Sequence, residues 1–171
     1  MKLSTSLVNL KKIHKKKRNQ IVFFSQKCKD YKFVENIYKF ILSKKNSFIF
    51  ESVEKGVLRG RYTIIGFNPD KIYNIKNNKI IVDDFKKKKI IKKDVLKYLN
   101  KLIEDFKVKS PVNVPRMSSM LVGYFSYDII RLIEKIPNKC KNDLNIPDIR
   151  LMRPKDLVIY DNLKKKNFFY T

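Results

Sequence analysis

The sequence predicts an α+β fold that is mainly antiparallel sheet with a few helices. Short apolar runs bounded by Gly, Pro or Asn recur along the 171 residues, as is typical of strands. Two other stretches repeat apolar residues at helical spacing. Turns rather than helices separate most of the strand patterns, and this favours antiparallel pairing over a βαβ parallel sheet.

One helix and several strands are predicted in the N-terminal half, after a basic lead-in at residues 1–19. The helix has one apolar face, and Asp30 precedes it as a candidate cap. That face consists of Phe33, Val34, Ile37, Phe40 and Ile41. Strands are predicted over 20–26, 47–53, 61–65, 71–76 and 79–83, the third ending at Gly66 and Pro69 and the last two forming a hairpin across Asn77-Asn78.

The C-terminal half contains the clearer helix and ends inside a strand pattern. The run Lys86–Lys89 reads as a solvated connector, and Asp94 then begins a helix. Its apolar face repeats through Val95, Leu96, Leu99, Leu102, Ile103 and Phe106. Strands over 120–125, 149–152, 157–160 and 168–171 and a short helix over 128–133 are predicted beyond it. Because an apolar strand at a chain end needs a partner, we expect further chain or a second chain to supply one.

The charge alone would suggest nucleic acid or an anionic membrane. The formal net charge is +24, but seven of the 40 basic residues are arginine and the rest are lysine. Nucleic-acid readers rely on arginine for bidentate contacts. We therefore interpret the lysine excess as solvated charge, with a basic nucleic-acid-binding module as the alternative. No apolar run approaches the ~20 residues that span a membrane.

Residues for catalysis or metal binding are sparse. The single histidine, His14, lies in a lysine run, and Cys28 and Cys140 have no CxxC spacing. Phosphate-loop and hydrolase motifs are missing from the sequence. We expect no catalytic residue and no metal ligand in this chain. A cytoplasmic location fits, with an organellar leader in the acid-free residues 1–29 as the alternative.

Three segments carry more information, and two of them hold all four glycines, where backbone geometry demands glycine. Residues 47–69 read SFIFESVEKGVLRGRYTIIGFNP. Residues 121–128 read LVGYFSYD, with Arg131 and the Glu134–Pro137 stretch beyond. Residues 146–154 read IPDIRLMRP, with Tyr160-Asp161 further on.

These segments resemble FLLESVEGG…GRYSFIGxxP, GGLxGYxxYDxVRxxEKLP and LPDxxLMxP…xFD of the anthranilate synthase large subunit, component I. Order and spacing agree from about residue 20 to 171. The resemblance implies that 20–171 is the N-terminal, regulatory domain and an incomplete portion of a two-layer fold. The C-terminal chorismate-binding catalytic domain would be absent.

The resemblance also implies an activity for the complete protein. The family is a lyase of tryptophan biosynthesis that converts chorismate and ammonia, with Mg²⁺, to anthranilate and pyruvate. A glutaminase subunit, component II, supplies the ammonia, and we expect a heterotetramer. L-tryptophan inhibits the enzyme by feedback. The Mg²⁺ ligands would lie outside this chain, and this piece alone would be inactive.

Ser52 corresponds to the serine of the family's LLES motif, which is a ligand for tryptophan. Because side chains alternate along a strand, Phe48, Phe50 and Ser52 would share one face. A tryptophan pocket needs an apolar wall for the indole and polar groups for the amino-acid head. Phe50 and Ser52 would supply both.

Glu51 is the third candidate for the tryptophan site, although alternation would point it away from the other two. The alternative for Glu51 is an ion pair with Arg59 or Arg61. The aromatic residues Tyr124 and Tyr127 are expected in the core, with an interface as the alternative.

The chain departs from the family at several positions. Ile49 and Phe50 replace two leucines, and Ser119, Met120 and Ser126 replace glycines. Side chains at glycine positions would crowd a close backbone approach. The related aminodeoxychorismate synthase of folate biosynthesis shares the GYxxYD region and is the alternative family. The ESVEGG…GRYSxIG stretch fits anthranilate synthase better.

Overall fold

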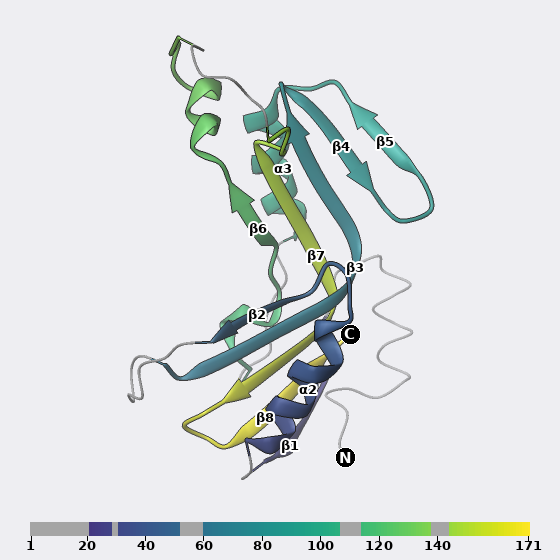
Figure 1. Cartoon of the computed structure of the whole chain (residues 1–171), viewed down its shortest axis with the longest axis vertical. Coiled ribbons are helices and arrows are strands. Elements are labelled where there is room, and N and C mark those ends of the chain that lie inside the picture. Colours follow the sequence, from purple (N-terminus) through teal and green to yellow (C-terminus); the bar gives the residue numbers. More distant parts are fainter. Residues whose placement is uncertain (1–20, 29–30, 52–59, 107–113, 138–143) are drawn as a thin grey trace. The chain divides into compact units, whose positions relative to one another are not determined.

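The computed structural model describes residues 21–28, 31–51, 60–106, 114–137 and 144–171. Within them it contains eight strands, two α-helices and two short 3₁₀ helices (Figure 1). The strands are β1 (Phe23–Lys27), β2 (Phe48–Glu51), β3 (Tyr62–Lys76), β4 (Lys79–Asp83), β5 (Lys88–Ile91), β6 (Val122–Phe125), β7 (Ile149–Asp161) and β8 (Lys166–Tyr170). The helices are α2 (Lys32–Leu42), α3 (Val95–Phe106), η1 (Arg116–Ser118) and η2 (Tyr127–Leu132).

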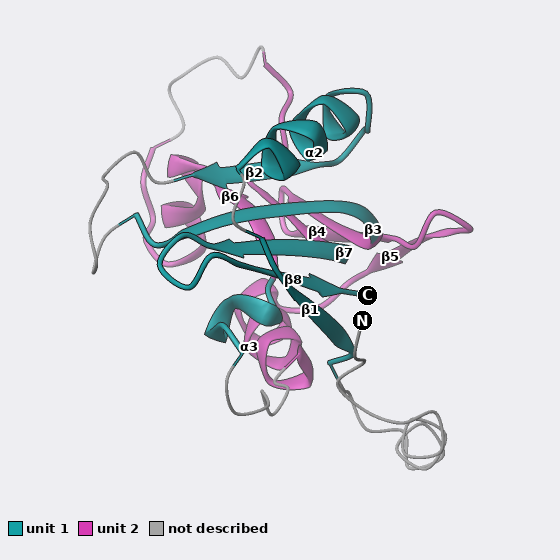
Figure 2. Ribbon diagram, turned by 90° about the horizontal axis from the view of Figure 1, so that it is seen from below, with its two compact units in different colours: residues 1–69, 107–120, 154–171 teal, residues 70–106, 121–153 magenta. Residues whose placement is uncertain are grey.

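The chain divides into two compact units, and β3 and β7 contribute residues to both (Figure 2). Unit 1 comprises residues 1–69, 107–120 and 154–171, and unit 2 comprises residues 70–106 and 121–153. One boundary follows Pro69 and another precedes Pro154.

Unit 1 is an antiparallel sheet with α2 on one face. Its strands follow the order β1-β8-β7-β3, and β2 pairs with β3. The amphipathic α2 buries Val34 and Ile41 against Ile65 of β3 and Val158 of β7. The next residues along these strands point to the opposite face, where Ile159 packs in a second cluster. That cluster also contains Leu157, Phe168, Tyr170, Phe48, Ile64, Met117 and Met120.

Unit 2 is a smaller sheet with α3 packed against it. Strand β6 pairs with β7, and β3, β4 and β5 follow on the other side of β7. Asp94 caps α3, because its carboxylate accepts a hydrogen bond from the Lys97 amide at 2.8 Å. The core of the unit joins α3 to β3, β4 and β7. It consists of Tyr73, Ile75, Ile80, Val95, Leu99, Ile149 and Leu151.

The structure confirms both helix predictions and the hairpin at Asn77-Asn78. Tyr73 faces Val82 across that hairpin, and both turn asparagines have positive φ, as a two-residue turn requires. The predicted cap at Asp30 and the lead-in at 1–19 lie outside the described residues.

Three strand predictions were wrong, each because pairing with a neighbouring strand overrides the local signal. Strand β3 continues through Gly66 and Pro69 rather than ending there, and β7 is one strand through Pro154 rather than two. Lys88 and Lys89 belong to β5, not to a connector, because β4 offers them a paired edge. Proline and glycine mark strand ends only where no neighbouring strand holds the chain extended.

The partner expected for the last strand comes from within the chain. Strand β8 lies between β7 and β1, with Phe169 opposite Val158 on one side and Phe24 on the other. The rings of Phe24 and Phe169 stack at 4.3 Å. The expectation that a further segment must pair with this strand was therefore wrong.

Gly123 of β6 supports a test of how closely two backbones approach. A Cβ atom at this position would lie 1.8 Å from the carbonyl oxygen of Arg150 in β7. We expect Gly123→Ala to lower the free energy of unfolding by about 1–3 kcal/mol, because the strands must separate. Urea unfolding measures this, with the exposed Lys92→Ala as control within about 0.5 kcal/mol. Equal stability of both variants would contradict the close packing.

Candidate functional site

The candidate site lies at strand β2 in unit 1, whose two faces have different surroundings. Ile49 packs in the cluster beneath α2, whereas Phe48 packs in the cluster on the opposite face. The rings of Phe48 and Phe50 are 4.9 Å apart, so these two side chains share a face as predicted. Ser52 falls outside the described residues, and its assignment stays a prediction.

Phe48 and Phe50 form an aromatic surface that solvent can reach. Phe50 is 49% exposed, and Phe48 is half-buried. Phe48 lies across from Gly66 in β3, and a Cβ at Gly66 would come within 2.2 Å of the Phe48 ring. Glycine at this position therefore lets the ring lie flat on the neighbouring strand. The sequence motif contained this glycine, but its contact with Phe48 was missed.

Glu51 lies on the other face of β2, where it meets the start of α2. Its carboxylate accepts a hydrogen bond from the Tyr31 hydroxyl. The Tyr31 and Tyr38 hydroxyl oxygens are 2.8 Å apart. Since Tyr31 donates to Glu51, Tyr38 is the donor to Tyr31. Burial, and then the hydrogen bond to Glu51, raise the pKa of Tyr31, so the chain of hydroxyls stays protonated at neutral pH.

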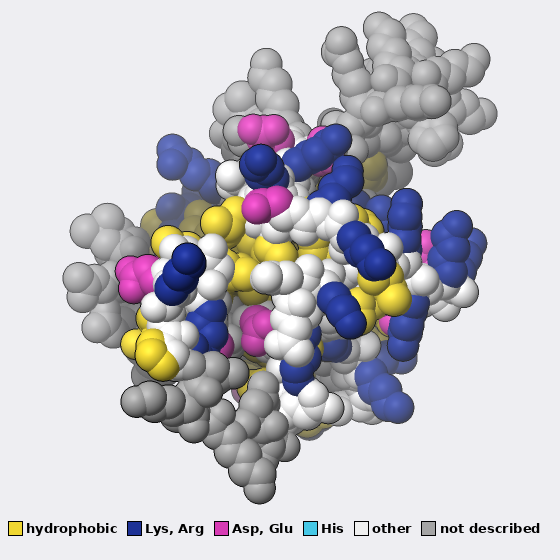
Figure 3. Space-filling view, turned by 90° about the horizontal axis from the view of Figure 1, so that it is seen from above, with side chains coloured by type: hydrophobic (Ala, Val, Ile, Leu, Met, Phe, Trp, Pro, Cys, Tyr) yellow, Lys and Arg dark blue, Asp and Glu magenta, His cyan; other side chains and the backbone are white. Residues whose placement is uncertain are grey.

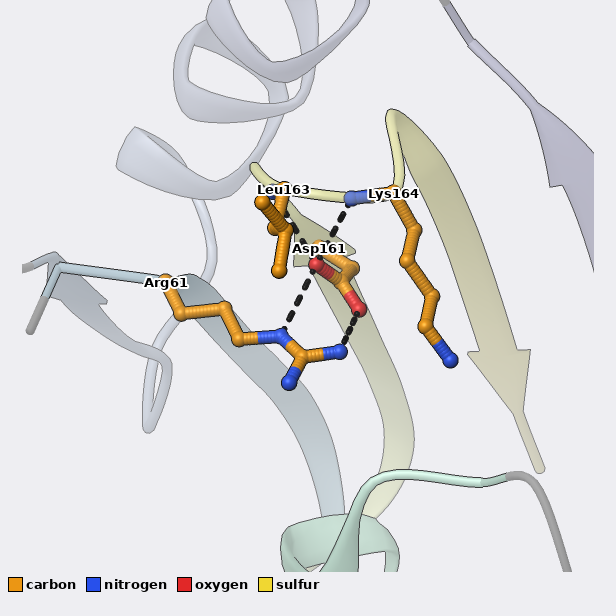
Figure 4. A network of polar contacts seen from close by, with 4 residues as sticks. All are labelled: Arg61, Asp161, Leu163 and Lys164. Atoms are coloured by element: carbon orange, nitrogen blue, oxygen red, sulfur yellow. Dashed lines mark hydrogen bonds and ion pairs between the residues drawn. The ribbon is translucent and has the colours of Figure 1, made fainter. Parts of the chain in front are cut away.

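The expected ion pair between Glu51 and Arg61 was wrong, because Arg61 binds another carboxylate. Its Nε and Nη2 donate to the two carboxylate oxygens of Asp161 at 3.1 and 2.8 Å (Figure 4). Arg59, the other proposed partner, is outside the described residues. Glu51 therefore joins β2 to the start of α2, whereas Arg61, just before β3, joins the end of β7.

Asp161 is the buried centre of a polar network at the ends of β3 and β7. It is 1% exposed and also accepts hydrogen bonds from the amides of Leu163 and Lys164 at 3.1 and 3.0 Å (Figure 4). Burial opposes ionisation, but the hydrogen bonds from Arg61 and these amides together lower the pKa of Asp161. Asp161 is therefore a carboxylate at neutral pH.

The same network places the backbone that follows residues 52–59. Gly60 has φ 75°, a conformation that favours glycine, and its carbonyl accepts a bond from the Asn162 side chain. The Asn162 amide donates to the Arg61 carbonyl at 2.8 Å. Glu51 and the Gly60-Arg61 pair are thus each held by contacts with other parts of unit 1.

Tyr124 and Tyr127 are not core residues, contrary to expectation. They are 38% and 89% exposed. Arg131 closes the turn after them by donating to Asp128 and to the carbonyls of Ile136 and Pro137. Periodicity could not reveal this, because the 3₁₀ turn lifts Tyr127 away from the sheet.

The surface chemistry outside this site offers few catalytic groups. Lys and Arg side chains are spread over the face shown in Figure 3 instead of gathering in one patch. Among the residues that the structure describes, no three His, Cys, Asp or Glu side chains gather as a metal site. No helix in the described part of the chain is long and apolar enough to cross a membrane.

Comparisons with known proteins give a consistent relationship. No family model matches the chain. Anthranilate synthase component 1 of Cereibacter sphaeroides is 29% identical over 165 residues, which cover 94% of this chain and 33% of the relative. The protein of the same name from Pseudomonas aeruginosa is 31% identical over 152 residues, 86% of this chain and 31% of the relative. The chain thus spans about a third of the length of these curated relatives.

A solved structure supports the fold. The crystal structure of anthranilate synthase component I from Streptococcus pneumoniae matches with a TM-score of 0.53 and 20% identity. The match covers 77% of this chain and 28% of that one. The predicted fold class is confirmed: a mostly antiparallel sheet with few helices, corresponding to a fragment of that structure.

The network at Asp161 leads to a prediction about pH. Because the pKa of Asp161 is lowered in the folded state, its stabilisation is present above the unfolded aspartate pKa of about 3.9 and is lost as pH falls. We expect Asp161→Asn to lower the free energy of unfolding by about 1–3 kcal/mol at pH 7, since the charge-assisted hydrogen bonds from the partly exposed Arg61 and from the two backbone amides lose their buried carboxylate. The difference from the wild type should shrink below about pH 4. Urea unfolding across pH checks this, and a difference independent of pH would contradict it.

Proposed function

Because the chain is a homologue of anthranilate synthase component I that spans about a third of that protein's length, we propose that it is the N-terminal, regulatory part of the large subunit. The complete enzyme would convert chorismate and ammonia to anthranilate and pyruvate in tryptophan biosynthesis. The two faces of β2 are the observation that carries the regulatory role. The relatives' shared name favours this assignment over aminodeoxychorismate synthase.

The proposed ligand of the regulatory site is L-tryptophan. Phe48 and Phe50 supply an accessible aromatic wall of the kind that an indole ring stacks on. Strand alternation carried on from Phe50 would bring Ser52 to the same face, where its hydroxyl would bond the amino-acid head group. Glu51 acts from the other face, and its role is to hold β2 against α2 through Tyr31.

The catalytic step is assigned to the part of the family protein that this chain does not include. Mg²⁺, when bound, would supply electrostatic stabilisation of the substrate carboxylates. We propose that the ligands of this ion also lie in the part of the family protein that this chain does not include. This chain's own contribution is the inhibitor site and the sheet that supports it.

The partners follow from the same assignment. We propose a glutaminase subunit, component II, as the source of ammonia and a heterotetramer as the complete assembly. We propose the cytoplasm as the location, with an organelle as the alternative. Nucleic acid is not proposed as a partner, because the basic residues are mainly lysines.

Tryptophan binding can be measured directly, because the chain has no tryptophan of its own. We expect a saturable change in the fluorescence of added L-tryptophan. Ser52→Arg should abolish the change by filling the head-group site with a long side chain. Phe50→Ala should weaken binding by about tenfold, through loss of ring stacking.

The control for these variants is Asn100→Arg, an exposed position on α3 in unit 2 that adds the same charge. It should bind tryptophan as the wild type does. Binding that survives Ser52→Arg, or that Asn100→Arg removes equally, would refute the site. D-tryptophan and L-phenylalanine test whether the head group and the indole are both recognised.

A further inference from the structure

Unit 2 contains a hollow that is lined by residues of this unit. It has a volume of about 310 Å³ and lies where α3 meets strands β3, β4, β5 and β7. Its described lining consists of Lys71, Tyr73, Val82, Lys89, Ile91, Tyr98, Leu102, Asp105, Phe106 and Arg153. Its volume is at the lower end of the range for small-molecule pockets, which is about 300–1,000 Å³.

The floor of this hollow is apolar and aromatic. Tyr73 is 4% exposed, and burial raises its pKa, so its hydroxyl is a neutral donor. No hydrogen bond to that hydroxyl is made by any residue that the structure describes. Tyr73 nevertheless contributes to the lining of the hollow. Tyr98 and Leu102 of α3 complete the floor.

The rim carries an excess of positive charge. Arg153 is already paired in a bidentate manner with Asp70, which leaves little of its charge for a ligand. Lys71 and Lys89 make no ion pair with the described residues, although Lys71 is near enough to Asp84 to help lower the pKa of that carboxyl. Asp105 is the acidic member of the lining. Two lysine ammonium groups above an aromatic floor favour an anion with an apolar body.

We propose that this hollow binds a small aromatic anion, with its carboxylate or phosphate held by Lys71 and Lys89 and its ring on Tyr73, Tyr98 and Leu102. The Tyr73 hydroxyl donates the remaining hydrogen bond to the ligand. The inference does not depend on the proposed function, because every residue involved belongs to unit 2.

Phenyl phosphate is the probe, and calorimetry on the full 171-residue chain is the measurement. We expect one saturable site that binds phenyl phosphate at least about tenfold more tightly than inorganic phosphate, because the floor contributes only with a ring present. Benzoate distinguishes a carboxylate from a phosphate head group. Tighter binding of either aromatic anion than of inorganic phosphate supports the proposal.

Two variants test the residues, and a matched pair controls for charge. Lys71→Gln combined with Lys89→Gln should weaken phenyl phosphate binding at least about tenfold, and Tyr73→Phe should weaken it severalfold while keeping the ring. Lys79→Gln combined with Lys86→Gln removes the same charge from the start of β4 and the β4–β5 turn, at positions that do not line the hollow. An equal loss in that control, no saturable binding, or equally tight binding of inorganic phosphate would overturn the proposal.

Discussion

The buried carboxylate of Asp161 is the constraint around which unit 1 is arranged. A charge that is 1% exposed needs full compensation, and Arg61 with two backbone amides provides it. These partners join the start of β3, the end of β7 and the turn into β8 (Figure 4). Arg61 and Asp161 come from two of the three sequence motifs, 100 residues apart. Two of the motifs that indicate the family therefore also contain the two members of this ion pair.

The contacts of β2 and of the chain after it explain how β2 presents one accessible aromatic face. Strand β2 is held from one side by Tyr31, which donates to Glu51, and the chain re-enters the sheet at Arg61. The Glu51 side chain is hydrogen-bonded to Tyr31 on one face of β2, and the other face presents Phe48 and Phe50. The proposed tryptophan site and the contact with α2 therefore use opposite faces of the same four-residue strand.

The elements that could be predicted from the sequence are those determined by residues close together in the chain. Periodicity located α2 and α3, and Asn77-Asn78 located a hairpin, because spacing and turn residues are sufficient for these elements. The continuity of β3 and β7 through Pro69 and Pro154 was not predictable, since neighbouring strands keep those prolines extended. The partners of Arg61 and Glu51 were missed for the same reason: both come from distant segments. The family motifs singled out β2 as the candidate strand, whereas the contacts of its side chains required the structure.

The central claim is that tryptophan binds on the Phe48–Phe50 face of β2. Nuclear Overhauser contacts between the indole protons of bound L-tryptophan and the aromatic rings of the chain test it most directly. The account predicts contacts to Phe50 and none to Tyr31 or Tyr38, which lie on the opposite face. Contacts to the tyrosine pair, or to Tyr73 and Tyr98 in unit 2, with none to Phe50, would contradict it.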